Sequence, residues 1–224
     1  MEMKKTTKKQ MWILCSGLLG AFIMMSSDWL MIYGDTSYQG NLAWLTQGVA
    51  KISASRNALA LGFGFLAIIF YSIALLGMKQ YIMEEKQKTI YTTLTTISMT
   101  PWLCVHLLYL MILFLFQWMH TKQYFELAYL STEALFAQFS WVIILSEVLM
   151  LLPFVYWFIL VFQKKTVFSK CYALNNPLFF YILLKAFTMI LPDVPASLAF
   201  VNGLMSEAMF LWFLVWLFHD LKKA

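Results

Sequence analysis

The chain has 224 residues, of which 62% are hydrophobic and only 12% are charged. This composition leaves too little polar surface to cover a soluble globule, so it excludes an ordinary water-soluble domain. The net charge of +5 indicates contact with anionic lipid headgroups, because the lysines lie between apolar segments, and no nucleic-acid partner is expected.

Six apolar segments follow one another along the chain, and each predicts a membrane-spanning helix. They cover approximately residues 10–33, 58–83, 90–118, 132–162, 177–191 and 199–219. Each approaches or exceeds the roughly 20 residues that a helix needs to cross the hydrocarbon core. The connections are short, and neither tail is long enough to fold independently. We therefore expect an all-α, polytopic transmembrane bundle of six helices that forms one domain over residues 1–224.

The distribution of the lysines predicts how this bundle is oriented. Most of the sixteen Lys and Arg residues fall in tails and connections that would share one side of the membrane: Lys4, Lys5, Lys8, Lys9, Lys79, Lys86, Lys88, Lys164, Lys165, Lys170, Lys222 and Lys223. The other side would hold only Lys51, Arg56 and Lys122. Positive residues are retained on the cytoplasmic side, so both termini are expected in the cytoplasm.

Helix signals accompany these segments. Ser53 and the Asn175-Asn176-Pro177 sequence precede the second and fifth segments, where their side chains would cap the first amides of each helix. Pro101 and Pro153 lie inside segments, and each removes one backbone hydrogen bond, which predicts a kink.

Ionisable residues within the predicted spans are the candidates for chemistry, because each costs about 2.5–3.5 kcal/mol to insert. Glu147 and Lys185 fall at similar depths, and an ion pair between them is one of two possible groupings. Whether such groups are functional or only tie helices together stays open at this point. The complete set is Asp28, His106, Glu147, Lys185 and Glu207.

A second expected group of polar residues centres on His106, midway along the third segment. An imidazole in hydrocarbon needs a hydrogen-bond partner, and we expect Glu207 first and Asp28 second. Asn202 lies one turn and a residue before Glu207 and would join this group.

Arg56 is the only arginine, and it lies where the second segment begins. Its planar guanidinium would clamp Asp35 or Asp28, tying the first two helices together. The alternative is that Arg56 and Asp35 contact an anionic headgroup or substrate on the outer face.

No sequence motif identifies a catalytic or metal centre. His-Glu-x-x-His and Gly-x-Ser-x-Gly are both missing from the sequence. Cys15, Cys104 and Cys171 lie away from an oxidising compartment and are expected to be free thiols. We expect no metal and no cofactor, and the sequence does not decide whether the protein is an enzyme.

Three short features lie in the first third of the chain: Gly34-Asp35, Ser55-Arg56 and Gly62-x-Gly64. With these features the chain resembles uncharacterised bacterial multi-span membrane protein families that carry Gly-Asp after the first helix and Ser-Arg before the second. The resemblance implies a multi-pass protein of the bacterial cytoplasmic (inner) membrane and implies no activity.

The function predicted from these observations is binding or transport of a hydrophobic or amphiphilic small molecule in a polar-lined intramembrane cavity. Membrane lipids are the expected partners. One alternative is an intramembrane acid–base enzyme that acts on a lipid-like substrate through His106, Glu147 and Glu207. Another is a structural or accessory membrane subunit in which the buried charges only tie helices together.

Overall fold

The computed structural model describes residues 8–34 and 49–221, and in these two ranges it is all-α apart from one isolated bridge between Ile82 and Thr166. Five helices are long and apolar enough to cross a membrane: α1 (Lys8–Ile32), α3 (Ala54–Gly77, continued to Tyr81 by the short η2, Met78–Tyr81), α4 (Glu85–Thr121), α5 (Phe125–Phe162) and α8 (Leu204–Leu221). The all-α prediction is confirmed, and the long apolar helices fit a membrane protein.

The last third of the chain differs from the predicted pair of full spans. The segment predicted at 177–191 forms α6 (Pro177–Thr188), whose 12 residues give a length of about 18 Å, against roughly 30 Å of hydrocarbon. The segment predicted at 199–219 is split at Gly203 into α7 (Pro195–Asn202) and α8. Six complete crossings of the membrane by this chain therefore stay a prediction.

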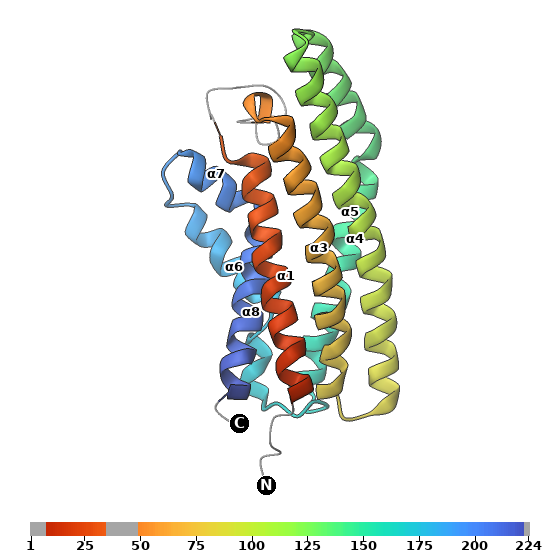
Figure 1. The fold of residues 1–224 in the computed structure, drawn as a ribbon. Coiled ribbons are helices and arrows are strands. Elements are labelled where there is room, and N and C mark those ends of the chain that lie inside the picture. Colours follow the sequence, from red (N-terminus) through yellow and green to blue (C-terminus); the bar gives the residue numbers. More distant parts are fainter. Residues whose placement is uncertain (1–7, 35–48, 222–224) are drawn as a thin grey trace.

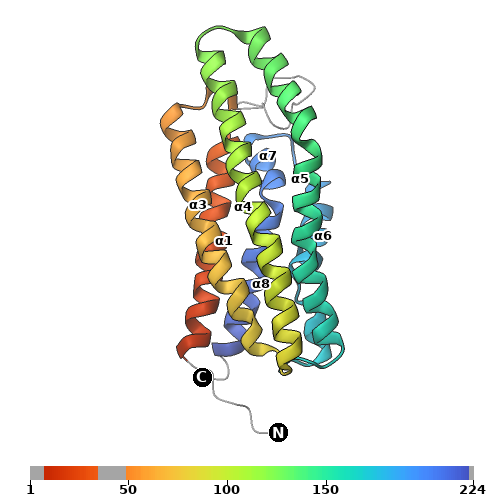
Figure 2. The ribbon, with the colours of Figure 1, turned by 90° about the vertical axis from the view of Figure 1, so that its right-hand side faces the viewer.

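The contacts between helices arrange them in an arc that does not close, and Figures 1 and 2 show this bundle from two sides. Neighbours along it are α5, α4, α3, α1, α8 and α6, with α7 against α1. The two ends of the arc, α5 on one side and α6 with α8 on the other, have few close backbone contacts. The space between these ends holds the cavities described below.

Aromatic side chains fill this space near the end of the bundle where α1 begins and α8 ends. Trp157 of α5 lies edge-on to Trp212 and Trp216 of α8, with ring centroids 6.2 and 6.3 Å apart. All three indoles are at least 99% buried. Phe168, in the connection after α5, packs against Trp216 in a tilted arrangement, with ring centroids 3.9 Å apart. The cluster joins the ends of the arc where their backbones stay apart.

Local chemistry explains how individual helices start and bend. Ser53 accepts a hydrogen bond from the Arg56 amide and Asn176 accepts one from the Leu178 amide, so both predicted caps are confirmed.

Pro153 leaves the carbonyl of Leu149 without its helical partner, because proline has no N–H. The hydroxyl of Ser98 in α4 lies 2.7 Å from that carbonyl and 2.7 Å from the carbonyl of Leu94 in its own helix, so its single proton is shared between the two acceptors. A polar bond thus joins α4 and α5 at the point where the α5 backbone would otherwise be unsatisfied.

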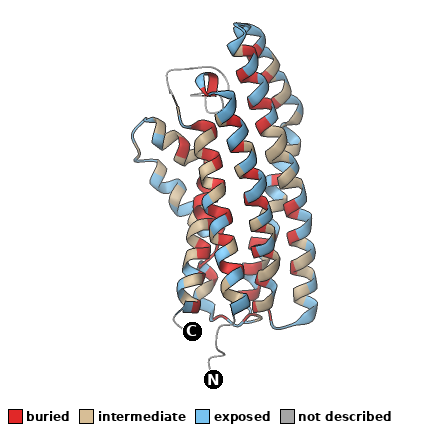
Figure 3. Ribbon diagram, in the orientation of Figure 1, coloured by how far each residue is buried: buried red, intermediate tan, exposed pale blue. Residues whose placement is uncertain are grey.

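Buried residues lie mainly on the helix faces that point into the bundle (Figure 3). Large apolar side chains cover much of the outside. Trp12, Phe22, Ile73, Trp141 and Ile182 are each more than half exposed. Such a surface is unfavourable in water and suits contact with lipid tails.

The beginning of α1 and the end of α8 lie at the same end of the bundle, whereas the hairpin between α4 and α5 projects at the opposite end (Figure 1). We call the first end inner and the second outer. The lysines of η2, the start of α4 and the segment after α5 belong to the inner end, in agreement with the predicted clustering of positive charge.

Candidate functional site

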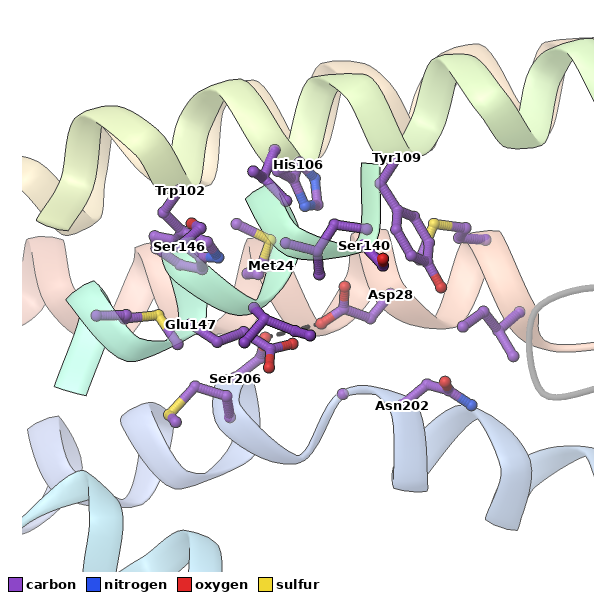
Figure 4. A pocket seen from close by; sticks show the side chains of 18 of the residues that line it. Met24, Asp28, Trp102, His106, Tyr109, Ser140, Ser146, Glu147, Asn202 and Ser206 are labelled. Atoms are coloured by element: carbon purple, nitrogen blue, oxygen red, sulfur yellow. Dashed lines mark hydrogen bonds between the residues drawn. The ribbon is translucent and has the colours of Figure 1, made fainter. Parts of the chain in front are cut away.

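A cavity of about 410 Å³ lies inside the open side of the arc (Figure 4). Its walls come from α1, α4, α5 and the junction of α7 with α8, which are far apart in sequence. The lining is mainly apolar and aromatic, with polar groups at a few points: Asp28, His106, Tyr109, Ser140, Ser146, Glu147, Asn202 and Ser206. Volume and lining are those of a site for a small organic molecule.

Asp28 is the acid most deeply placed in this cavity. Its side chain is 9% exposed, and one carboxylate oxygen, Oδ2, accepts a hydrogen bond of 2.7 Å from the hydroxyl of Ser206. The bond joins α1 to α8 across the cavity wall. Within the described part of the chain, the second oxygen, Oδ1, has no hydrogen-bond partner, and the carboxylate points into the cavity in Figure 4.

Glu207 lies behind the cavity wall and does not line it. Its Oε1 accepts a hydrogen bond of 3.3 Å from the indole of Trp29, and the side chain is 6% exposed. The carboxylate folds back over Gly203, where a Cβ would lie 2.8 Å from Oε1. Only glycine leaves room for this arrangement at the break between α7 and α8. Glu207 therefore acts in the structure as a tie between α1 and α8.

His106 lines the cavity, but its predicted partner was wrong. The imidazole packs against Gly64 of α3, in the space that a Cβ at position 64 would occupy. Among the residues that the structure describes, Nε2 has no hydrogen-bond partner, so neither Glu207 nor Asp28 is bound to it. The reason is that both acids bind groups on α1 or α8, whereas the ring is directed by the close approach of α3 and α4.

Glu147 lies at the mouth of the cavity, on the exposed side of α5. It also lines a second cavity, of about 390 Å³, which extends between α5, α6 and α8. The predicted ion pair of Glu147 with Lys185 is not formed, since no salt bridge joins them in the described residues. Lys185 is exposed, close to the end of α6, and lines neither cavity.

Asn202 lines both cavities from the last residue of α7. Its side-chain nitrogen donates a hydrogen bond of 2.8 Å to the main-chain carbonyl of Leu198. This bond leaves the side-chain oxygen of Asn202 available as an acceptor. Ile144, Met150 and Met205 are shared by the two cavities as well, so the spaces are contiguous.

Arg56 occupies a different place from the predicted clamp with Asp28. Its Nη2 donates to the carbonyls of Trp29, at 3.1 Å, and Tyr33. These carbonyls lie at the C-terminal end of α1, where the carbonyl of Trp29 also accepts a hydrogen bond of 2.9 Å from the amide of Tyr33. Arg56 thus caps α1 from α3, and its positive charge meets the negative end of the helix dipole. Asp35 lies outside the described residues.

Comparison with known proteins gives a family and no activity. A family of unknown function, DUF6796, matches residues 3–223, which is nearly the whole chain. The chain belongs to this family. No curated protein and no solved structure matches it. The specific Gly-Asp and Ser-Arg features and the bacterial origin stay predictions.

Several cavity residues of this DUF6796 chain were not singled out from the sequence. Trp102 and Tyr109 lie four residues before and three residues after His106, so helical spacing places them on one face. Ser140 lies seven residues before Glu147, two turns along the same face of α5. Spacing around the charged residues was the signal that would have found all three.

The chemistry open to these residues is binding through charge and hydrogen bonds. Among the described residues, no group of three His, Cys, Asp or Glu side chains is placed to hold a metal ion. The thiols of Cys15, Cys104 and Cys171 are free and exposed.

Proposed function

We propose that this protein binds or transports a hydrophobic or amphiphilic small molecule that reaches the cavity from the lipid bilayer. The observation that carries the proposal is the pair of contiguous cavities, which runs from Asp28 inside the arc to the flank of α5 and α6. A molecule dissolved in the bilayer would pass between α5 and α8 without crossing water.

The shape of the arc supports lateral access. Aromatic side chains fill the inner end between α5 and α8, so a ligand moving toward the cytoplasm would meet Trp157 and Trp212. The outer part of the same gap contains the cavities instead. The acid–base enzyme alternative is less well supported, because His106 Nε2 has no hydrogen-bond partner among the described residues and Glu207 is used as a helix tie.

A cavity-filling substitution tests the proposal. Ser140 is exposed and lines the cavity, so the indole introduced by Ser140→Trp would fill the cavity without disturbing a buried core. Leu145→Trp is the matched control on the same helix, because Leu145 is 49% exposed and lines neither cavity. Binding of decanol to the protein in lipid nanodiscs, measured by calorimetry against protein-free nanodiscs, should be lost in Ser140→Trp and kept in Leu145→Trp. Equal binding by both variants would refute the proposed site.

We further propose that the protein lies in a bacterial inner membrane, with the inner end of the bundle in the cytoplasm. The support is the gathering of lysines at that end. In a chain whose three native cysteines are replaced, Lys86→Cys should react with an impermeant thiol reagent only after the membrane is opened. Gln123→Cys, in the α4–α5 connection, should react in intact cells. The reverse pattern would overturn the orientation.

A further inference from the structure

We propose that the ligand of the cavity is a lipophilic cation: an amine or quaternary ammonium group with an apolar tail, its positive head lying between Asp28 and Glu147. This inference rests on the proposed function and adds the sign of the ligand's charge. It follows from which groups line the cavities, which hydrogen bonds are left open, and where the apolar walls lie.

The charges that line the two cavities have one sign. Asp28 and Glu147 are both carboxylic acids, and in the described ranges no Lys or Arg side chain lines either cavity. Arg56 is bound to main-chain carbonyls at the end of α1, and Lys185 is exposed near the end of α6, one turn after Tyr181, and lines neither cavity. An anionic head would face carboxylates with no countercharge, which costs several kcal/mol in such surroundings.

Asp28 has an open position for a positive group. Its side chain is nine-tenths buried, yet only Oδ2 is bound, to Ser206. In the described structure Oδ1 has no partner and faces the cavity (Figure 4). This oxygen is open to the cavity, where the positive head of a ligand would bind it directly.

The walls around this position suit a cation with an organic shell. Trp102, Tyr109 and Phe136 line the cavity with aromatic rings, whose faces attract alkylammonium groups. Met24 and Met150 add flexible, polarisable side chains that adapt to irregular shapes.

The second cavity provides the place for an apolar tail. Its walls include Val148, Leu151, Leu178 and Leu204, from α5, α6 and α8. Glu147 lines both spaces and so lies at their junction. A single-tailed amphiphile with its head between Asp28 and Glu147 would place its tail along these aliphatic side chains of the second cavity.

A series of three probes with the same tail tests the sign of the charge. Decyltrimethylammonium, decanol and decanoate would be titrated into the protein in nanodiscs of zwitterionic phosphatidylcholine. The cation should bind about tenfold or more tightly than the alcohol, and the carboxylate should bind most weakly. Equal binding of cation and alcohol, abolished by Ser140→Trp, would overturn this inference and leave the proposed function standing. Failure of all three probes to bind would overturn both.

Two isosteric variants assign the effect to the two acids. Asp28→Asn keeps an oxygen for Ser206, and Glu147→Gln changes an exposed position, so the second variant remains informative if the first folds poorly. Each should weaken binding of the cation about tenfold while decanol affinity stays within about twofold. Glu126→Gln, at an exposed acid in the first turn of α5, is the control and should change neither. A loss of cation affinity in Glu126→Gln equal to that in Glu147→Gln would contradict the assignment.

Discussion

Replacing Gly64 by Ala would put a methyl group into the space occupied by the His106 imidazole. A Cβ at position 64 overlaps the Nε2 end of the ring, whereas a Cβ at position 62 would have no heavy atom within 4 Å. Both glycines lie inside α3, two residues apart, so Gly62→Ala is a matched control with the same change in helix propensity.

The two substitutions should change the free energy of unfolding in opposite directions. In an exposed helix interior, alanine is favoured over glycine by about 0.5–1 kcal/mol, so Gly62→Ala should raise the free energy of unfolding by that amount. At Gly64 the same gain is opposed by overpacking, which costs about 1–3 kcal/mol because α3 and α4 are closely packed there. The net result should be a loss of about 1–2 kcal/mol.

Removing the ring should remove the penalty. In a His106→Ala background, Gly64→Ala should be neutral or stabilising, which gives a coupling energy of about 1–3 kcal/mol between the two positions. The free energy of unfolding would be measured for the single and double variants by titration with a denaturing detergent in mixed micelles. If Gly64→Ala stabilises the protein as much as Gly62→Ala, or if the effects at 64 and 106 add, the described contact between α3 and α4 is incorrect.

Three other substitutions test the polar ties between helices through the same unfolding measurement. Gly203→Ala should displace the Glu207 carboxylate from its bond with an indole and cost about 1 kcal/mol, a cost that disappears in Glu207→Ala; an undiminished cost in that background would count against it. Ser98→Ala should lower the free energy of unfolding by about 0.6–1.7 kcal/mol. The loss should be smaller in a Pro153→Ala background, where the restored N–H bonds to the Leu149 carbonyl, and equal losses in both backgrounds would contradict the role of Ser98 as its partner. Arg56→Ala should cost about 1 kcal/mol because it uncaps α1, and an unchanged stability would show that the bonds to the carbonyls contribute nothing.

Much of the fold could be predicted from the sequence because the signals are local. Long apolar segments predicted the five long helices, and Asn176 followed by Pro177 predicted the start of α6. The break at Gly203 was missed because the apolar segment continues through it, and a single glycine is tolerated inside a helix. The carboxylate of Glu207 packs over the glycine at this break, a contact that only the folded chain reveals.

The site could be predicted only in part, since it depends on pairs of helices. Intramembrane position alone identified Asp28, Glu147 and Asn202, all of which line the cavity. The partners were wrong because depth along a span does not give the rotation of each helix. Lys185, which was expected at a depth similar to that of Glu147, lines neither cavity and forms no salt bridge with Glu147 among the described residues.

The most direct test of the proposed cation site is an experimental structure of the protein in nanodiscs with bromine-labelled decyltrimethylammonium. The proposal predicts density for the ammonium head between Asp28 and Glu147, and bromine density in the space lined by Leu151 and Leu178 of α5 and α6. A cavity that stays empty at saturating probe, or a bound molecule with its tail against Asp28 and its head outside, would contradict it.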